Sequence, residues 1–112
     1  MNTSYFGNKK IQKDPNAVSI ARYAPRFWGK GRRFIQLAPS KELLNEIHNG
    51  LPFDEYKLRY RKEVLDKLKV ADVYSQLRDS ILVCWEKEPE KCHRRIVAEW
   101  IENELSVPVT EI

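Results

Sequence analysis

The run Ile81-Leu82-Val83-Cys84-Trp85 decides the fold, because it is apolar throughout and shows no alternation with polar residues. A strand with one face in water alternates apolar and polar side chains, whereas a strand covered on both faces stays apolar. Strands of the second kind are typical of parallel sheets, in which other layers cover both faces. The run therefore predicts the central strand of a parallel β-sheet.

The segments on either side of this run alternate between strand-like and helix-like patterns. Short β-prone runs predict strands within residues 1–12, at Ala17–Ala21 and at Val107–Glu111. Apolar spacing of three and four residues predicts helices over Lys41–Asn49 with Ser40 as the cap, over residues 53–68, over Asp72–Arg78, and from Cys92 onward. Strands separated by helices predict a small Rossmann-like α/β sandwich of three layers, with about four mostly parallel strands and helices on both faces.

The length and composition of the chain restrict its class. It has 112 residues, of which 42% are hydrophobic and 32% are charged, as is typical of a globular protein and not of a disordered or fibrous one. We expect residues 1–112 to form one domain, because this length suits a single core. No apolar run approaches the roughly 20 residues of a membrane span, and no signal-peptide core is present, so we expect a cytoplasmic protein without a membrane partner.

The positive charge of the chain is concentrated in its first third. Residues 1–40 hold eight lysines and arginines against one acid, a net charge of +7, whereas the remaining residues carry −3. Within this third, residues 22–34 combine five cations with four aromatic side chains and no acid. This composition suits phosphate neutralisation and base stacking, and it predicts a nucleic-acid or substrate loop. The candidates in this loop are Arg26, Trp28, Lys30, Arg32 and Arg33. In the alternative, the aromatic side chains pack on the sheet while the cations face water.

A second cluster of functional side chains covers the end of the central strand, a charged loop and the start of the last helix. Cys92, His93 and Arg94 fall in the first turn of that helix, where free N–H groups and the helix dipole favour an anion and a thiolate. Glu86 follows the strand directly, which suits a general acid or base, and His93 suits proton transfer near neutral pH. Each residue also has a plainer role: core packing for Cys92, an ion pair for Glu86, and a hydrogen bond to a carbonyl for His93.

The two cysteines are too few for a disulfide scaffold. We expect Cys84 and Cys92 to be core residues, metal ligands or reactive thiols rather than a structural bridge. With His93 they have the composition of a zinc site, but seven residues separate them, more than the roughly two to four of a zinc knuckle. We therefore keep zinc only as the less favoured alternative, and we expect no metal and no cofactor. The phosphate-binding and dinucleotide-binding glycine motifs are also absent from the sequence.

The chain carries three motifs in this order: Val18-Ser19-Ile20-Ala21-Arg22-x-x-Pro25, Leu37-Ala38-Pro39-Ser40, and Cys84-x-Glu86-x-x-Pro89-x-x-Cys92-His93-Arg94. In these motifs it resembles the domain of unknown function 488 family over nearly its whole length. The resemblance implies a compact Rossmann-like α/β domain of bacterial or phage type, and it names no reaction. The signature positions that it implies are Ser19, Arg22, Pro25, Trp28, Pro39, Ser40, Cys84, Glu86, Cys92, His93 and Arg94. One departure is Ala21-Arg22-Tyr23, where relatives often read Ser-Arg-Gly.

These patterns predict an anion site at the carboxyl ends of the strands, where parallel sheets bind ligands. A nucleotide or a nucleic-acid phosphate is the expected ligand. The anion-binding candidates are Arg22, Arg94 and, from the resemblance, Ser19, and the catalytic candidates are Glu86, His93 and Cys92. Hydrolysis or group transfer at a phosphate or glycosidic bond fits this set. The alternatives are a non-catalytic nucleic-acid-binding module that uses residues 22–34 and a small protein-interaction domain.

Overall fold

The computed structural model describes residues 1–29 and 31–112, and Lys30 of the basic loop lies outside the described residues. The sheet has the strand order β2-β3-β1-β4, and every pair of neighbouring strands is parallel. Its strands are β1 (Asn2–Tyr5), β2 (Ala17–Ser19), β3 (Ile81–Cys84) and β4 (Thr110–Glu111). The predicted parallel sheet is confirmed, and β3 is a central strand between β2 and β1.

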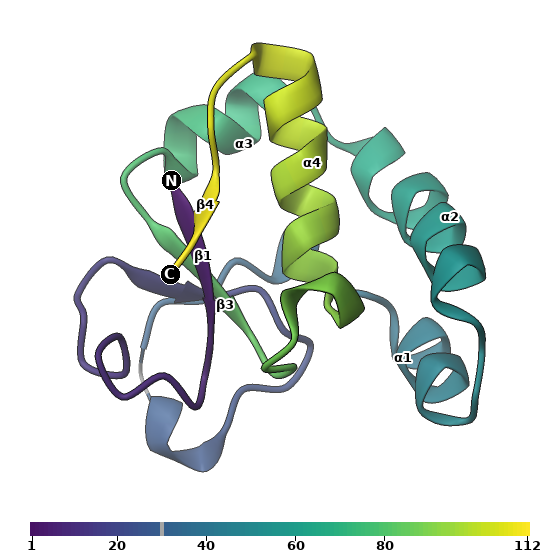
Figure 1. Ribbon diagram of the computed structural model, residues 1–112, viewed down its shortest axis with the longest axis horizontal. Helices are drawn as coiled ribbons and strands as arrows, with labels where there is room; N and C mark the ends of the chain where they lie inside the picture. Colours follow the sequence, from purple (N-terminus) through teal and green to yellow (C-terminus); the bar gives the residue numbers. More distant parts are fainter. Residues whose placement is uncertain (30) are drawn as a thin grey trace.

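In the described residues, four α-helices connect or follow these strands, as can be traced in Figure 1. They are α1 (Lys41–His48), α2 (Phe53–Glu63), α3 (Val70–Leu77) and α4 (His93–Leu105). Short 3-10 helices lie at η1 (Arg26–Trp28), η2 (Ile35–Leu37), η3 (Leu65–Lys67) and η4 (Pro89–Lys91). Ser40 caps α1 as predicted, because its hydroxyl oxygen accepts a hydrogen bond from the Leu43 N–H at 3.0 Å. The predicted helix over residues 53–68 is shorter in the structure, since the chain bends at Val64 and buries Leu65 in a tighter turn.

Different parts of the chain pack on the two faces of the sheet. These two layers and the sheet between them form the sandwich. Leu82 and Cys84 face a large core cluster that includes side chains from all four α-helices. Ile81 and Val83 face a smaller cluster with Phe6, Ile11 of the β1–β2 connection and Trp28 of η1. Because both faces of β3 are covered, its side chains are all buried, which explains its continuous apolar sequence.

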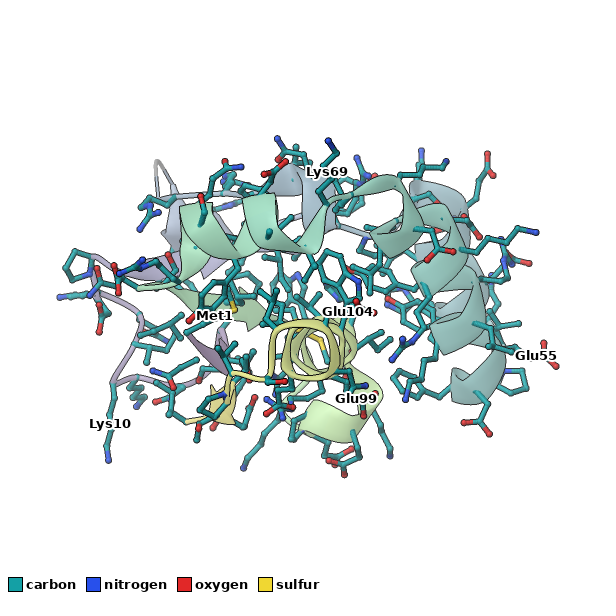
Figure 2. The ribbon with its side chains drawn as sticks, turned by 90° about the horizontal axis from the view of Figure 1, so that it is seen from above. Met1, Lys10, Glu55, Lys69, Glu99 and Glu104 are labelled. Carbon is teal, nitrogen blue, oxygen red and sulfur yellow. A yellow bond between two sulfur atoms is a disulfide. The ribbon has the colours of Figure 1, made fainter. Side chains whose placement is uncertain are left out.

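Charged side chains surround this core. Figure 2 looks along α4 and shows Lys10, Glu55 and Lys69 pointing away from the packed interior. All three are exposed. In the part of the chain that the structure describes, no helix has the length and apolar character needed to cross a membrane.

The last strand brings the two ends of the chain together. β4 pairs with β1, and the Ile112 N–H donates to the Thr3 carbonyl at 2.8 Å (Figure 1). The strand is shorter than the predicted Val107–Glu111, because the chain leaves α4 through Ser106 in the left-handed conformation and pairs with β1 only from Thr110. This short strand brings the Glu111 carboxylate to Arg94 of α4, with which it forms an ion pair.

Candidate functional site

A pocket of about 610 Å³ opens at the carboxyl ends of β2 and β3. Its polar side comes from the turn after β2, the loop after β3 and the start of α4, and its apolar side comes from α1 and α2. The lining residues are Ala21, Arg22, Tyr23, Pro39, Leu44, Ile47, His48, Leu51, Phe53, Tyr56, Cys84, Trp85, Glu86, Lys91, Cys92 and His93. Its place agrees with the rule that open parallel sheets bind ligands beyond their carboxyl edge.

The structure brings four of the predicted site residues to this pocket: Arg22, Glu86, Cys92 and His93. They come from three separate segments, which meet because β2 and β3 are parallel neighbours whose carboxyl ends share one edge. Glu86 is exposed at the edge of the pocket. The partly buried Arg22 donates from Nε to the Pro39 carbonyl at 2.9 Å, so its guanidinium has a defined position.

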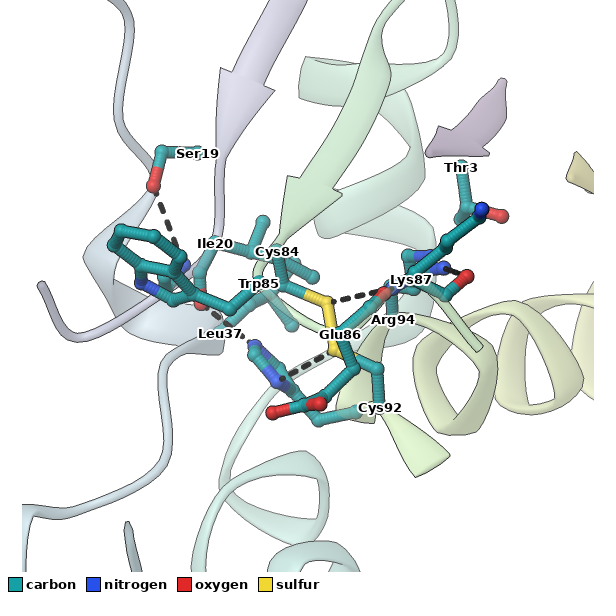
Figure 3. The surroundings of a disulfide bond; sticks show 12 residues. Thr3, Ser19, Ile20, Leu37, Cys84, Trp85, Glu86, Lys87, Cys92 and Arg94 are labelled. Atoms are coloured by element: carbon teal, nitrogen blue, oxygen red, sulfur yellow. Dashed lines mark hydrogen bonds between the residues drawn. A yellow bond between two sulfur atoms is a disulfide. The ribbon is translucent and has the colours of Figure 1, made fainter. Parts of the chain in front are cut away.

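Cys84 and Cys92 are joined by a disulfide, which corrects the expectation that they do not form a bridge (Figure 3). Cys84 ends β3 and Cys92 precedes α4, so the bond ties the central strand to the start of the last helix. Both residues are almost fully buried, at 1% and 4% exposure. In this oxidised form Cys92 has no thiol, and the predicted thiolate nucleophile is not present.

His93 is the first residue of α4, and its ring is buried at 5% exposure. Its Nε2 lies 2.8 Å from the Ile20 carbonyl oxygen, which accepts hydrogen bonds only, so Nε2 carries the proton and Nδ1 keeps its lone pair. The pKa of His93 is lowered to about 4: burial is the largest cause, the hydrogen bond to the Ile20 carbonyl raises the pKa, and the Arg94 charge lowers it. The ring is therefore neutral at pH 7 with its Nε2–H engaged, which argues against His93 as a proton donor there, and its role in proton transfer stays a prediction.

Arg94 does not line the pocket, which corrects its predicted role in anion binding. Its guanidinium is fully buried at 0% exposure and donates to Glu111 at 2.8 and 2.9 Å, to the Lys87 carbonyl at 3.2 Å and to the Glu86 carbonyl. It also donates to the Cys84 sulfur at 3.3 Å (Figure 3). With its donors occupied in this way, Arg94 braces the loop after β3.

Glu111 is the carboxylate that balances this buried charge. Partial burial raises the pKa of Glu111, but hydrogen bonds from Arg94 and Thr3 and the nearby cationic charges lower it, and the result lies below the ordinary value. The ion pair joins α4 to β4, seventeen residues apart in the chain. The sequence offered no sign of this partner, because Glu111 stands outside the motif that contains Arg94.

The other described candidates, Ser19, Arg26, Trp28, Arg32 and Arg33, also lie outside the lining of this pocket. Ser19 is 1% exposed and its hydroxyl accepts from the Ala21 N–H at 3.3 Å, so it supports the turn after β2 and is not available to an anion. Trp28 is 7% exposed, packs edge-to-face on Phe6 at 5.2 Å and donates to the Arg32 carbonyl, so it belongs to the core. Arg26, Arg32 and Arg33 are exposed. In this part of the basic loop, the aromatic side chain of Trp28 packs in the core and the arginines face water, which is the alternative arrangement considered for residues 22–34.

The sequence analysis missed the aromatic wall of the pocket. Phe53 and Tyr56 stack with ring centroids 5.6 Å apart on α2, and both line the pocket. Burial and the Glu86 charge raise the pKa of Tyr56, so its phenol stays protonated and can donate a hydrogen bond. The spacing of these residues predicted the apolar face of a helix. It did not predict that part of this face would line a pocket, because that depends on how α1 and α2 pack.

Lys91 was missed as well. It lines the pocket from η4, directly before the disulfide cysteine of α4. Its ammonium lies 3.1 Å from the Glu88 carboxylate in an exposed pair, and such pairs contribute little and exchange readily. The charged run at residues 86–91 contained the signal, but the sequence alone does not say which of its charges faces inward.

The sheet and the pocket at its carboxyl edge define a small parallel α/β protein of Rossmann-like type. A family model described as the "Active DUF488-N3 subclade" matches residues 1–105. The chain therefore belongs to the domain of unknown function 488 family, as its motifs indicated. No curated protein and no solved structure shows a significant match to it.

Proposed function

We propose that the pocket binds a nucleotide and that the protein is a hydrolase or transferase acting on it. The observation that supports this most directly is the composition of one pocket of about 610 Å³, whose lining combines a guanidinium, an ammonium, a carboxylate and an aromatic wall. A nucleotide has the matching parts: an anionic phosphate, a flat apolar base, and glycosidic and ester bonds between the two.

The phosphate would bind on the polar side of the pocket. Arg22 is held through Nε by Pro39, and its two terminal nitrogens make no hydrogen bond to any residue that the structure describes. A guanidinium in this state presents a fork that matches phosphate oxygens. Lys91 adds a second cation from η4. Ser19 and Arg94 are not part of this anion site, for the reasons given above.

The base would lie against Phe53 and Tyr56. Aromatic stacking with a base contributes about 1–3 kcal/mol and tolerates any base, because every base has a π-face. Trp85 and Tyr23 line the pocket too and are each 53% exposed, so they provide further aromatic surface at its edge. The wall therefore supports binding of a nucleotide more than binding of a bare phosphate.

Glu86 would act as the general acid or base. It is the single acid among the pocket-lining residues that the structure describes, and it follows β3 directly. His93 is neutral at pH 7 with its N–H engaged, and Cys92 is bonded to Cys84, so neither competes for this role in the oxidised protein.

Binding is tested with a panel of nucleotides and nucleosides in thermal unfolding experiments. A ligand at a hundred times its Kd stabilises the folded state by about 2.7 kcal/mol, a clear shift in Tm. We expect nucleotides to raise the Tm more than nucleosides, and Arg22→Met to lower their affinity by about tenfold or more, the effect of one charge-assisted hydrogen bond. The matched control is Arg26→Met, an exposed arginine outside the pocket. Equal effects of the two substitutions would contradict the proposal.

Catalysis is tested by incubating the protein with the nucleotide that binds best and separating the products by chromatography. The products identify the bond that breaks: a free base for the glycosidic bond, or a nucleoside for the phosphate ester. Glu86→Gln should reduce turnover by about a hundredfold while binding persists. Glu90→Gln, which removes an exposed acid outside the pocket, should leave turnover unchanged. Turnover that survives Glu86→Gln would exclude this residue as the acid or base.

The alternative function, a nucleic-acid-binding module, is supported by the outer surface of the basic loop. Arg26, Arg32 and Arg33 are exposed, and Phe27 of the same loop is 58% exposed. These side chains are free to meet a phosphate backbone and a base, although Trp28 is not. Both functions are proposed for the cytoplasmic location that the sequence predicts.

A further inference from the structure

Three side chains with metal-binding atoms converge on the pocket: Cys84, Cys92 and His93. The two sulfurs and a ring nitrogen of His93 all lie within 4.8 Å of one another, the one such trio among the residues that the structure describes. All three residues are buried, yet all three line the pocket. The trio therefore lies at the pocket surface, where a small ion can reach it from solvent.

The His93 ring is oriented as in a metal site. Its Nε2–H donates to the Ile20 carbonyl, so the lone pair on Nδ1 points to the sulfur side, 3.8 Å from the Cys92 sulfur. Histidines that bind metals almost always donate their other N–H to a carbonyl or carboxylate in this way. Bond lengths at tetrahedral zinc put neighbouring sulfur and nitrogen ligands about 3.6 Å apart, close to the distance seen here.

The surroundings of the sulfurs favour their negative form. Arg94 donates from Nη1 to the Cys84 sulfur at 3.3 Å, which places a buried cation beside that atom (Figure 3). Cys92 is the N-cap residue of α4, a helix of 13 residues, and so lies in the positive field of its first turn. Nearby cations and helix N-termini stabilise thiolates, and the thiolate is the form that binds metal.

We propose that Cys84, Cys92 and His93 form a three-ligand site for a zinc ion when their disulfide is reduced. Two thiolates and one imidazole are a ligand set that selects zinc, and three protein ligands leave the fourth tetrahedral position open. Two cysteines separated by seven residues do not fit a structural zinc knuckle. They do fit a site assembled from the end of β3 and the start of α4.

The conversion between the two forms is a balanced redox step followed by an acid–base step. A small dithiol transfers two electrons and two protons to the Cys84–Cys92 bond, which breaks into two thiols, while the dithiol becomes a cyclic disulfide. Each thiol then loses its proton to solvent as its sulfur bonds the ion. In the reverse direction the cyclic disulfide takes up two electrons from the two thiolates and two protons from solvent and becomes the dithiol again, while the Cys84–Cys92 bond re-forms and the ion is released. The disulfide and the metal therefore exclude each other.

A zinc ion at this place would add a Lewis acid to the pocket that contains Arg22 and Glu86. The inference goes beyond nucleotide binding and does not depend on it, because the metal is detected without any nucleotide. The nucleotide panel applied to the oxidised protein tests the proposed function alone, so the two proposals fail separately.

The test uses cobalt(II) as a spectroscopic substitute for zinc. Protein reduced with a dithiol and then freed of it under inert gas should bind one cobalt per chain. It should also show the sulfur-to-cobalt charge-transfer absorption of thiolate ligands. Zinc should displace the cobalt and remove the absorption. The oxidised protein is the matched negative control and should show none of this.

Substitutions then identify the ligands. Cys84→Ser, Cys92→Ser and His93→Gln should each weaken cobalt binding by more than about tenfold. His48→Gln, which changes the other histidine of the pocket, should leave it unchanged. Folded, reduced wild-type protein that binds no cobalt, or His93→Gln with wild-type affinity, would overturn the proposal. X-ray absorption of the wild-type zinc complex avoids any folding defect of the variants: two sulfurs and a nitrogen in the first shell support the site, and a shell without sulfur refutes it.

Discussion

The basic loop at residues 22–34 and the pocket at the carboxyl edge of the sheet present opposite cases. The loop is conspicuous in the sequence, since it contains five cations and four aromatic residues in one stretch. In the structure its Trp28 is core and its arginines at positions 26, 32 and 33 face water. The pocket combines the motif that begins at Cys84 with Arg22 from the turn after β2 and an aromatic wall from α2, so only part of it is visible as one stretch of sequence. It brings together a guanidinium, a carboxylate, an aromatic wall and a trio of metal-binding atoms. Local composition thus marks surface charge, whereas a site depends on the convergence of separate segments.

The largest expected effect contrasts two arginines, one behind the pocket and one on the loop. Arg94→Met removes a fully buried cation that holds Glu111 and two loop carbonyls, and it should lower the free energy of unfolding by about 4 kcal/mol. Arg32→Met changes an exposed side chain and should stay within about 0.5 kcal/mol. Urea unfolding followed by circular dichroism measures both. Similar small losses would show that Arg94 does not brace the pocket.

The second prediction concerns the two adjacent aromatic residues of the loop. Trp28→Ala should destabilise the fold by about 3 kcal/mol, because the ring packs on Phe6 under the sheet. Phe27→Ala should cost less than about 0.5 kcal/mol, since that ring is 58% exposed. Thermal unfolding gives both values. If Trp28 served nucleic-acid stacking instead, its loss would weaken oligonucleotide binding and leave the Tm nearly unchanged.

The third prediction is a dependence on pH from the Glu111 carboxylate. Its pKa in the folded state lies below the ordinary value of 4.5, so the unfolded chain takes up its proton first as the pH falls. The stabilising contribution is therefore complete above pH 4.5 and decreases as the pH falls through the lowered pKa. Glu111→Gln should be less stable than wild type at pH 7, and the difference should shrink in acid. A difference that stays constant from pH 7 to pH 3 would contradict the Arg94–Glu111 pairing.

The smallest expected effect tests the loop as a nucleic-acid surface. Replacing Arg32 and Arg33 together by Gln should leave nucleotide binding in the pocket within about twofold, because neither residue lines it. If the loop binds single-stranded DNA, the slope of log affinity against log salt should fall by about 1.4, the value for two lost phosphate contacts. The same change at Lys9 and Lys10, two exposed cations outside the loop, is the control. An unchanged slope removes the nucleic-acid-binding alternative.

Much of the fold was predictable, because its signals are local. The apolar run Ile81–Cys84 and the strands at each end indicated a parallel sheet, and the Ser40 cap indicated where α1 begins. The ends of α2 and β4 were less predictable. They depend on the burial of Leu65 and on pairing with β1, which are contacts between distant parts of the chain.

Less of the site was predictable, although its location was. Arg22 and Glu86 were placed at one edge by the rule for parallel sheets, and the structure places them there. The role expected of Arg94 changed because Glu111 approaches it from β4. The expected absence of a metal site rested on sequence spacing, which does not measure how near the Cys84 and Cys92 sulfurs come in space.

The sequence by itself determined the sheet, its central strand and the edge that carries the site, because periodicity and capping act between neighbouring residues. Only the tertiary structure decided which polar side chains face the pocket and which are engaged in hydrogen bonds and ion pairs that stabilise the surrounding structure. Whether a guanidinium or an imidazole is available to a ligand depends on its hydrogen-bond partners from elsewhere in the chain, such as Glu111 for Arg94 and Ile20 for His93. These partners set burial and hydrogen bonding, and therefore the chemistry, of residues whose identities the sequence already displayed.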